Sequence, residues 1–298
     1  MKKGIPLMSA HTSMPIAECR IVTDSSSDMR GMGHIAFASA PLKIVTAQKE
    51  YVDDESLDIV SMVEDLQVYK GRSTTSCPNP EEWLRAFGDA TCVFCITITA
   101  TLSGSYNAAM NAKRLYEERY PDRHVFVMNS LSTGPEMRLI AECIEQQILS
   151  GHSFDDVCAH AAAYAEGTGL LFMLRSMKNL ANNGRVHPLV AKFAGLMGIR
   201  LIGKASARGD LEPLGKCRGA RASLAYLLDR LQELGYAGGR VYIAHCVNEE
   251  EATMLRAQLQ ERWPSATVEV YPCRALCSFY AEFGGLLVGF EKGNKANI

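Results

Sequence analysis

Apolar runs followed by hydroxyl-rich turns occur three times in the first half of the chain. After each turn the pattern becomes helical: CRIVT precedes DSSSD, CVFCITIT precedes ATLSGS, and HVFVM precedes NSLSTGP. Strands that alternate with helices in this way are typical of βαβ units, in which consecutive strands are parallel. The pattern therefore predicts an α/β fold whose N-terminal domain contains a parallel sheet.

The segments between these units predict further elements. Residues 41–70 contain short alternating pieces and then a helical run, which indicates a small hairpin and a helix inserted into the first domain. Asn79, Pro80 and Glu82 supply an N-cap, a first-turn proline and a capping-box acid, so we predict a helix over Pro80–Phe87. Helical runs also follow Gly134 and Ser153.

The regular alternation of strand and helix is lost after about residue 169. Strand-like pieces such as VYIAH are here separated by turns and by two amphipathic runs, ASLAYLLDRLQELG and EEEATMLRAQLQERW. Such a mixture is typical of an antiparallel sheet with helices. We therefore expect two domains, an α/β domain over 1–168 with an extension at 1–15, and an α+β domain over 169–298.

Composition and charge exclude several classes of function. The 31 basic and 33 acidic side chains give a net charge of −2, which does not favour nucleic-acid binding. No stretch approaches the ~20 apolar residues that cross a bilayer, so we predict a cytoplasmic protein without stable membrane insertion. The ten cysteines lie mostly in apolar segments and are expected to be free thiols. We predict no metal and no cofactor.

Several hydroxyl clusters are expected to meet at one edge of the parallel sheet. Residues 24–27, 103–105 and 129–132 follow strands directly, and 73–76 precede the predicted helix at Pro80. Each cluster alone is explained by helix capping, but together, beyond the carboxyl ends of the strands, they favour an anion site. No phosphate-binding glycine loop with a lysine is present, so a carboxylate is the better fit.

Ser103 is also a candidate nucleophile. His245, at the end of the apolar strand VYIAH, is the best available base, although a strand-end histidine is more often satisfied by the backbone. The G-x-S-x-G motif of hydrolases is not matched, because Thr101 and Leu102 precede Ser103. A serine-dependent hydrolase or acyl-transfer enzyme is therefore kept as the alternative function.

From about Cys19 to Phe290 the chain resembles the DegV family of bacterial fatty-acid-binding proteins, the lipid carriers of the fatty acid kinase system. The resemblance is carried by IVTDSSSDM, TTSCPNPEEW, ITITATLSGSYNAAMNA, VMNSLSTGPEM and MLRSMKNLANNGRV. The sequence departs from the family pattern at Cys77, which replaces a glutamine, and at Asn129, which replaces an acid. Tyr280 stands where kinase-delivering members have a histidine.

The resemblance implies a non-catalytic carrier that holds one long-chain fatty acid between or beneath its domains. Thr75 and Ser103 would bind the carboxylate, with Tyr280 as a further hydroxyl donor. Ser76, Gly104 and Ser105 would support them through backbone donors. Arg185 would lie near the head group, unless it is a solvated turn residue. The family's partner is a fatty acid kinase catalytic subunit, and Tyr280 leaves open whether this chain uses one.

Burial of the acyl chain would supply the binding energy. At ~0.8 kcal/mol for each methylene, a 16-carbon chain gains on the order of 12 kcal/mol before ordering costs. The segments LLFMLRSM, VAKFAGLMGI and FGGLLVGF are candidates for the tunnel wall, and each of them is equally explained as ordinary core.

Overall fold

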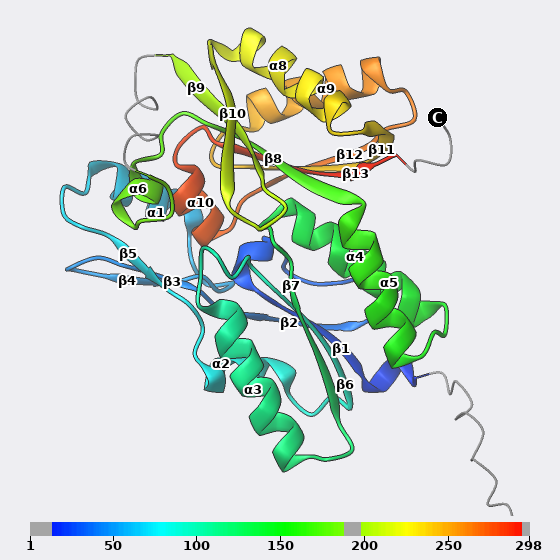
Figure 1. The fold of residues 1–298 in the computed structure, drawn as a ribbon. Coiled ribbons are helices and arrows are strands. Elements are labelled where there is room, and N and C mark those ends of the chain that lie inside the picture. The colour runs from blue at the N-terminus through cyan, green and yellow to red at the C-terminus, as the bar shows by residue number, and fades with distance from the viewer. Residues whose placement is uncertain (1–13, 188–197, 294–298) are drawn as a thin grey trace, which may run out of the picture.

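The computed structural model describes residues 14–187 and 198–293, and it contains a four-stranded parallel sheet in its N-terminal half (Figure 1). The order across this sheet is β2 (Ala36–Ala40), β1 (Cys19–Asp24), β6 (Cys92–Thr97) and β7 (His124–Asn129). All three neighbouring pairs are parallel. The α/β fold predicted from the recurring strand, turn and helix pattern is therefore confirmed.

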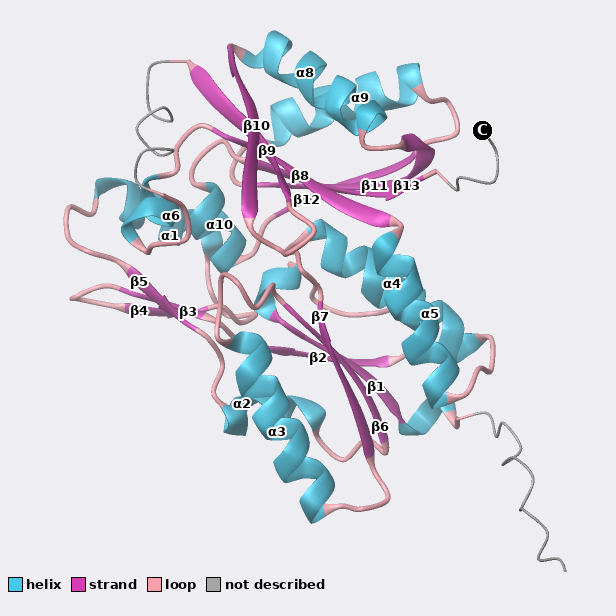
Figure 2. Cartoon of the chain, in the orientation of Figure 1, coloured by secondary structure: helices cyan, strands magenta, loops and turns pink. Residues whose placement is uncertain are grey.

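Helices cover both faces of this sheet. The helices α2 (Pro80–Phe87) and α3 (Ser105–Arg119) pack on one face, and α4 (Pro135–Leu149) and α5 (Phe154–Glu166) pack on the other (Figures 1 and 2). Because both faces are covered, consecutive strand residues are buried on opposite sides, as Ile21 and Val22 are on β1. This explains why these strands appear in the sequence as continuous apolar runs.

The start of α2 follows the predicted capping box. The Asn79 side chain accepts a hydrogen bond from the Glu82 backbone N–H at 2.9 Å, and the Glu82 carboxylate accepts one from the Asn79 N–H at 2.8 Å. Pro80 occupies the first turn, where its missing N–H costs nothing. The predicted helix over Pro80–Phe87 is confirmed at both ends.

A small three-stranded antiparallel sheet lies beside the parallel one. The hairpin of β3 (Lys43–Val45) and β4 (Glu50–Val52) is followed by the helix α1 (Ile59–Val68). Strand β5 (Thr74–Ser76) then pairs with β3 and places Thr75 opposite Ile44. The hairpin therefore positions the hydroxyl cluster at 73–76, which in the sequence is recognisable only from the helix α2 that follows it.

The second half of the chain forms a six-stranded sheet. Its order is β10 (Leu211–Arg218), β9 (Ile199–Ala205), β8 (Thr168–Leu174), β13 (Leu286–Lys292), β11 (Tyr236–His245) and β12 (Thr267–Pro272). Neighbours are antiparallel, as predicted, except for β11 and β12, which are parallel. The exception arises because the helix α9 (Glu249–Arg262) connects these two strands as a crossover.

The two faces of the six-stranded sheet have different neighbours. The helix α8 (Ala220–Glu233) and α9 cover one face, where Leu171 and Met173 of β8 are buried. The alternate residues of β8 are turned toward the parallel sheet and toward two short helices, α6 (Lys178–Asn182) and α10 (Ala275–Ala281) (Figure 2). This face of the six-stranded sheet is therefore bordered by apolar side chains of β8, α1, α6 and α10.

The helix α10 is fixed in this space by a buried ion pair, which we call the α10 anchor (Asp53 and Arg274). The Arg274 Nε atom donates to Asp53 Oδ1 at 3.2 Å, and its other nitrogens donate to the carbonyls of Asp53 and Met29. Asp53 also accepts from the N–H groups of Ala275 and Leu276, and so caps the helix. The anchor joins the end of β4 to the start of α10.

All ten cysteines are free thiols, as predicted. Cys92 and Cys95 both lie on β6 and are buried, which gives no support to a redox role for this pair. Within the part of the chain that the structure describes, no helix is both long enough and apolar enough to cross a membrane.

Candidate functional site

A buried carboxylate organises the hydroxyl loops at the carboxyl edge of the parallel sheet. Asp24, the last residue of β1, accepts hydrogen bonds from the Ile98 N–H at 2.9 Å and from the Ser105 hydroxyl at 2.6 Å. Its other oxygen accepts from the backbone and the hydroxyl of Ser26. Burial raises the pKa of Asp24, while these hydrogen bonds oppose the increase. Asp24 therefore joins three loops and is not itself available to a ligand.

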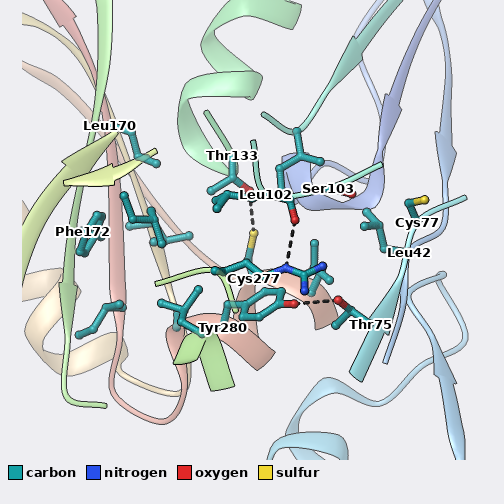
Figure 3. A pocket seen from close by; sticks show the side chains of 18 of the residues that line it. Leu42, Thr75, Cys77, Leu102, Ser103, Thr133, Leu170, Phe172, Cys277 and Tyr280 are labelled. Carbon is teal, nitrogen blue, oxygen red and sulfur yellow. Dashed lines mark hydrogen bonds between the residues drawn. The ribbon is translucent and has the colours of Figure 1, made fainter. Parts of the chain in front are cut away.

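A cavity of about 280 Å³ lies between the loops and the six-stranded sheet (Figure 3). Much of its wall is apolar and comes from both halves of the chain, including Leu42, Leu170, Phe172, Leu174, Leu276 and Leu287. The polar groups are confined to one side, where Thr75, Ser103 and Tyr280 lie away from Leu170 and Phe172. The cavity therefore suits a long molecule with one polar end.

The polar end is held together by two contacts between the first and second halves of the chain. The hydroxyls of Thr75 and Tyr280 are 2.7 Å apart and share one hydrogen bond. The Arg185 Nε atom donates to the Leu102 carbonyl at 3.1 Å, which places the guanidinium beside Ser103. Among the described residues that line the cavity, Arg185 is the one with a formal charge.

Helix α3 begins at the same place. Ser103 and Gly104 line the cavity just before the first turn of this helix, and the Ser103 Oγ atom accepts a hydrogen bond from the Ser105 N–H at 3.2 Å. The N-terminus of a helix carries unsatisfied N–H groups and a partial positive charge, both of which favour an anion. Burial raises the pKa of Tyr280, so its phenol is a neutral hydrogen-bond donor at pH 7.

The structure brings six of the seven predicted ligand-binding residues to this cavity. They are Thr75, Ser76, Ser103, Gly104, Arg185 and Tyr280. Ser105 is not among the lining residues, because the first turn of α3 directs its hydroxyl inward to Asp24 and its N–H is taken by Ser103. The contact of each residue with a ligand stays a prediction.

Cys77, Thr133 and Cys277 also line the cavity and were not among the predicted ligand-binding residues; Thr133 and Cys277 lie next to each other. Their Oγ1 and Sγ atoms are 3.6 Å apart (Figure 3). Thr133 follows the hydroxyl cluster after β7 by one residue, and Cys277 precedes Tyr280 by three residues on the same face of α10. Helical spacing from Tyr280 was the signal that would have found Cys277.

The apolar segments proposed for the tunnel wall have different outcomes. LLFMLRSM supplies Leu170, Phe172 and Leu174, and FGGLLVGF supplies Leu287. In VAKFAGLMGI, residues 190–197 lie outside the described residues.

The base required by the alternative function is not at the cavity. His245, at the end of β11, does not line it, and its Nδ1 atom accepts a hydrogen bond from the Asn248 N–H at 3.3 Å. The described residues that do line the cavity include no histidine, aspartate or glutamate. Ser103 therefore has no partner there that would take its proton.

Comparisons with known proteins agree with this architecture. The family model described as "Uncharacterised protein, DegV family" matches residues 18–292. A DegV domain-containing protein of Streptococcus pneumoniae is 43% identical over 276 residues, which are 91% of this chain and 98% of that protein.

Two solved structures are similar along most of their length. A DegV family protein from Eubacterium eligens loaded with heptadecanoic acid has a TM-score of 0.91 and 42% identity, over 92% of this chain and 100% of that one. The Fatty Acid Kinase (Fak) B3 protein of Streptococcus pneumoniae loaded with linoleic acid has a TM-score of 0.90 and 42% identity, over 92% and 99% of the two chains. With this fold and a match over residues 18–292, the chain belongs to the DegV family.

Proposed function

We propose that this protein binds one long-chain fatty acid and acts as a carrier without chemistry of its own. The carboxylate lies among Thr75, Ser103, Arg185 and Tyr280, and the acyl chain occupies the apolar part of the cavity. The observation that carries this proposal is a largely apolar cavity with its polar groups on one side only. Similar proteins that hold heptadecanoic and linoleic acids support it. Its cytoplasmic location is part of the same proposal.

Burial of the acyl chain and pairing of the carboxylate contribute to binding at different parts of the cavity. Each buried methylene contributes ~0.8 kcal/mol, so the acyl chain supplies most of the affinity. A buried carboxylate without partners would cost several kcal/mol, and the hydroxyls, the guanidinium and the start of α3 remove that cost. The polar residues therefore fix the direction of the chain more than its affinity.

The experiment that tests the proposal is mass spectrometry of the purified protein under native and then denaturing conditions. A fatty acid released on denaturation supports the carrier. Protein that releases no fatty acid and binds none when it is offered would contradict it. An acyl adduct on Ser103 would favour the hydrolase instead.

A double substitution tests the position of the carboxylate. Thr75→Ala with Ser103→Ala removes two donors, and the loss of each hydrogen bond to a charged group costs ~1.5–3 kcal/mol. Fatty acid affinity measured by calorimetry should fall at least about tenfold, with an unchanged circular dichroism spectrum. Ser150→Ala with Thr267→Ala, two exposed positions, is the matched control. Equal affinities for the two double variants would exclude this position for the carboxylate.

We further propose that the bound fatty acid is delivered to a fatty acid kinase. The similarity to the Fatty Acid Kinase (Fak) B3 protein supports a kinase as the partner. Tyr280 is a neutral hydrogen-bond donor at pH 7, so it cannot take up and release a proton as readily as a histidine at this position would. Acyl phosphate trapped with hydroxylamine, after incubation of the loaded protein with a kinase catalytic subunit and ATP, is the expected product.

A further inference from the structure

Alternate residues of β8 form one row that continues past the end of the cavity. Leu170, Phe172 and Leu174 project from the same face of the strand and line the cavity. Thr168, two residues before Leu170, continues the row toward the start of β8 and lines a separate groove of about 720 Å³. Leu170 belongs to both linings. The cavity and the groove therefore adjoin at this side chain.

Two other elements pass from the cavity to the groove at the same level. In the connection between β7 and α4, Leu131 lines the groove and Thr133 lines the cavity. In the hairpin of β9 and β10, Ala205 lines the groove and its register partner Leu211 lines the cavity. The boundary is therefore made by side chains and not by an intervening helix or sheet.

The backbone around this boundary is held in place. The tip of the hairpin rests on the loops of the parallel sheet, where the Thr101 hydroxyl donates to the Gly209 carbonyl at 2.8 Å. Gly209 has a φ of +85°, and a Cβ atom there would approach Thr99 Oγ1 to 2.1 Å. Because the hairpin tip is in such close contact with these loops, the backbone at this boundary has little room to move.

The position of Leu170 relative to the polar end is visible in Figure 3. Thr75 and Ser103 lie on one side of the view, and Leu170 lies on the other. The row of β8 runs at ~3.3 Å per residue, so it follows an extended chain closely. At the opposite end of the row, Leu174 packs in the core with Met177 and Leu180. Among the described residues of β8, Leu170 is the one that lines both the cavity and a second hollow.

The groove beyond Leu170 is suited to more methylenes. Its wall includes the apolar residues Phe126, Met128, Ala162, Ala165 and Phe290, together with the charged residues Glu136, Glu166, Lys204 and Lys292. Leu170 itself is only 2% exposed, so its side chain fills the passage between the two spaces. A fatty acid whose tail reaches Leu170 stops there, although there is apolar space on the other side.

Resting on the proposed function, we propose that Leu170 sets the upper limit of acyl chain length. Leu170→Ala opens the cavity into the groove and admits longer chains, whereas Leu170→Phe shortens the accepted range. Each methylene that becomes buried raises affinity about fourfold, the fold-change that corresponds to ~0.8 kcal/mol. The substitution therefore changes the ratio between acids of different length more than the affinity for short ones.

The test offers the purified protein an equimolar mixture of saturated C14 to C22 acids and quantifies the retained acids by mass spectrometry. Leu170→Ala should raise the ratio of C20 to C16 acid at least tenfold over wild type, and Leu170→Phe should lower the ratio of C18 to C14 acid. Leu171→Ala is the matched control, because it removes the same atoms from a fully buried neighbour on the other face of β8. Its ratios should equal those of wild type.

Two outcomes would overturn the inference alone. One is a C20 to C16 ratio in Leu170→Ala within twofold of wild type, and the other is a change of that ratio caused by Leu174→Ala instead. If Leu170→Ala does not fold, an unchanged profile of Leu170→Phe decides against the inference. Wild-type protein that retains no acid from the mixture would overturn the proposed function and the inference together.

Discussion

The α10 anchor gives the sharpest prediction for stability. Asp53→Ala removes a carboxylate that is fully buried and leaves the Arg274 guanidinium, only 4% exposed, without its charged partner. The same substitution leaves two N–H groups at the start of α10 without an acceptor. We expect a large loss, because the buried guanidinium keeps only the Met29 carbonyl and the carbonyl of residue 53 as hydrogen-bond acceptors, and the nearby Asp28 carboxyl accepts from the Arg274 backbone instead.

The magnitude follows from the contacts. Removing one partner of a buried pair costs ~3–5 kcal/mol, and the loss of a helix cap costs ~1 kcal/mol. These contributions overlap because they share one carboxylate, so we expect a decrease of about 4 kcal/mol in the free energy of unfolding. For a chain of this size that corresponds to a fall of roughly 10 °C in the melting temperature.

The assay is urea unfolding followed by circular dichroism, with calorimetry for the melting temperature. Glu118→Ala is the control, because its ion pair with Arg114 has side chains that are 60% and 64% exposed, and surface pairs contribute little. It should stay within about 0.5 kcal/mol of wild type. A loss below about 1 kcal/mol for Asp53→Ala would refute the argument that this charge pair stabilises the junction between β4 and α10.

Further predictions concern the phenol of Tyr280 and the buried carboxyl of Asp28. Tyr280→Phe removes the hydroxyl that is paired with Thr75 and should weaken fatty acid binding at least about tenfold in calorimetry, since a hydrogen bond to a carboxylate contributes ~1.5–3 kcal/mol; unchanged affinity would place the carboxylate elsewhere. Burial raises the pKa of Asp28 from 3.8 to about 8, so the folded protein keeps a proton that the unfolded chain releases. The resulting stability is complete below pH 3.8 and is lost as the pH rises to about 8. Asp28→Asn should therefore gain stability relative to wild type across this window, by up to ~1.4 kcal/mol per pH unit in urea unfolding; a constant difference would contradict the raised pKa.

The features that could be predicted from the sequence are those determined by a local pattern of residues or by the direction of neighbouring strands. The strands of the parallel sheet are continuous apolar runs because helices cover both faces of the sheet. The start of α2 is determined by Asn79, Pro80 and Glu82, which form its cap and first turn. The convergence of the hydroxyl loops follows from the common direction of β1, β6 and β7. These features depend on neighbouring residues or on a general rule of topology, so they required no knowledge of distant contacts.

The features that the sequence did not predict depend on contacts between remote segments. Asp53 and Arg274 are 221 residues apart, and neither position shows a local pattern that calls for the other. Ser103 and Ser105 look equivalent in the chain, yet only Ser103 lines the cavity, because the helix that begins between them turns Ser105 toward Asp24. The contact of the β9–β10 hairpin with Thr101 also joins remote segments, so it could not be predicted from a local pattern.

The wall of the cavity is contributed by both halves of the chain, and this has a consequence for exchange. The gap is crossed at its polar end by the Thr75–Tyr280 hydrogen bond and by the contact of Arg185 with the Leu102 carbonyl. An acyl tail covered from both sides leaves when these contacts open, so its escape rate depends on how often they open as well as on its own hydrophobicity. Residence time and affinity are thus separate properties of this molecule, and a binding partner that only loosens those two contacts would unload it without competing for the lipid.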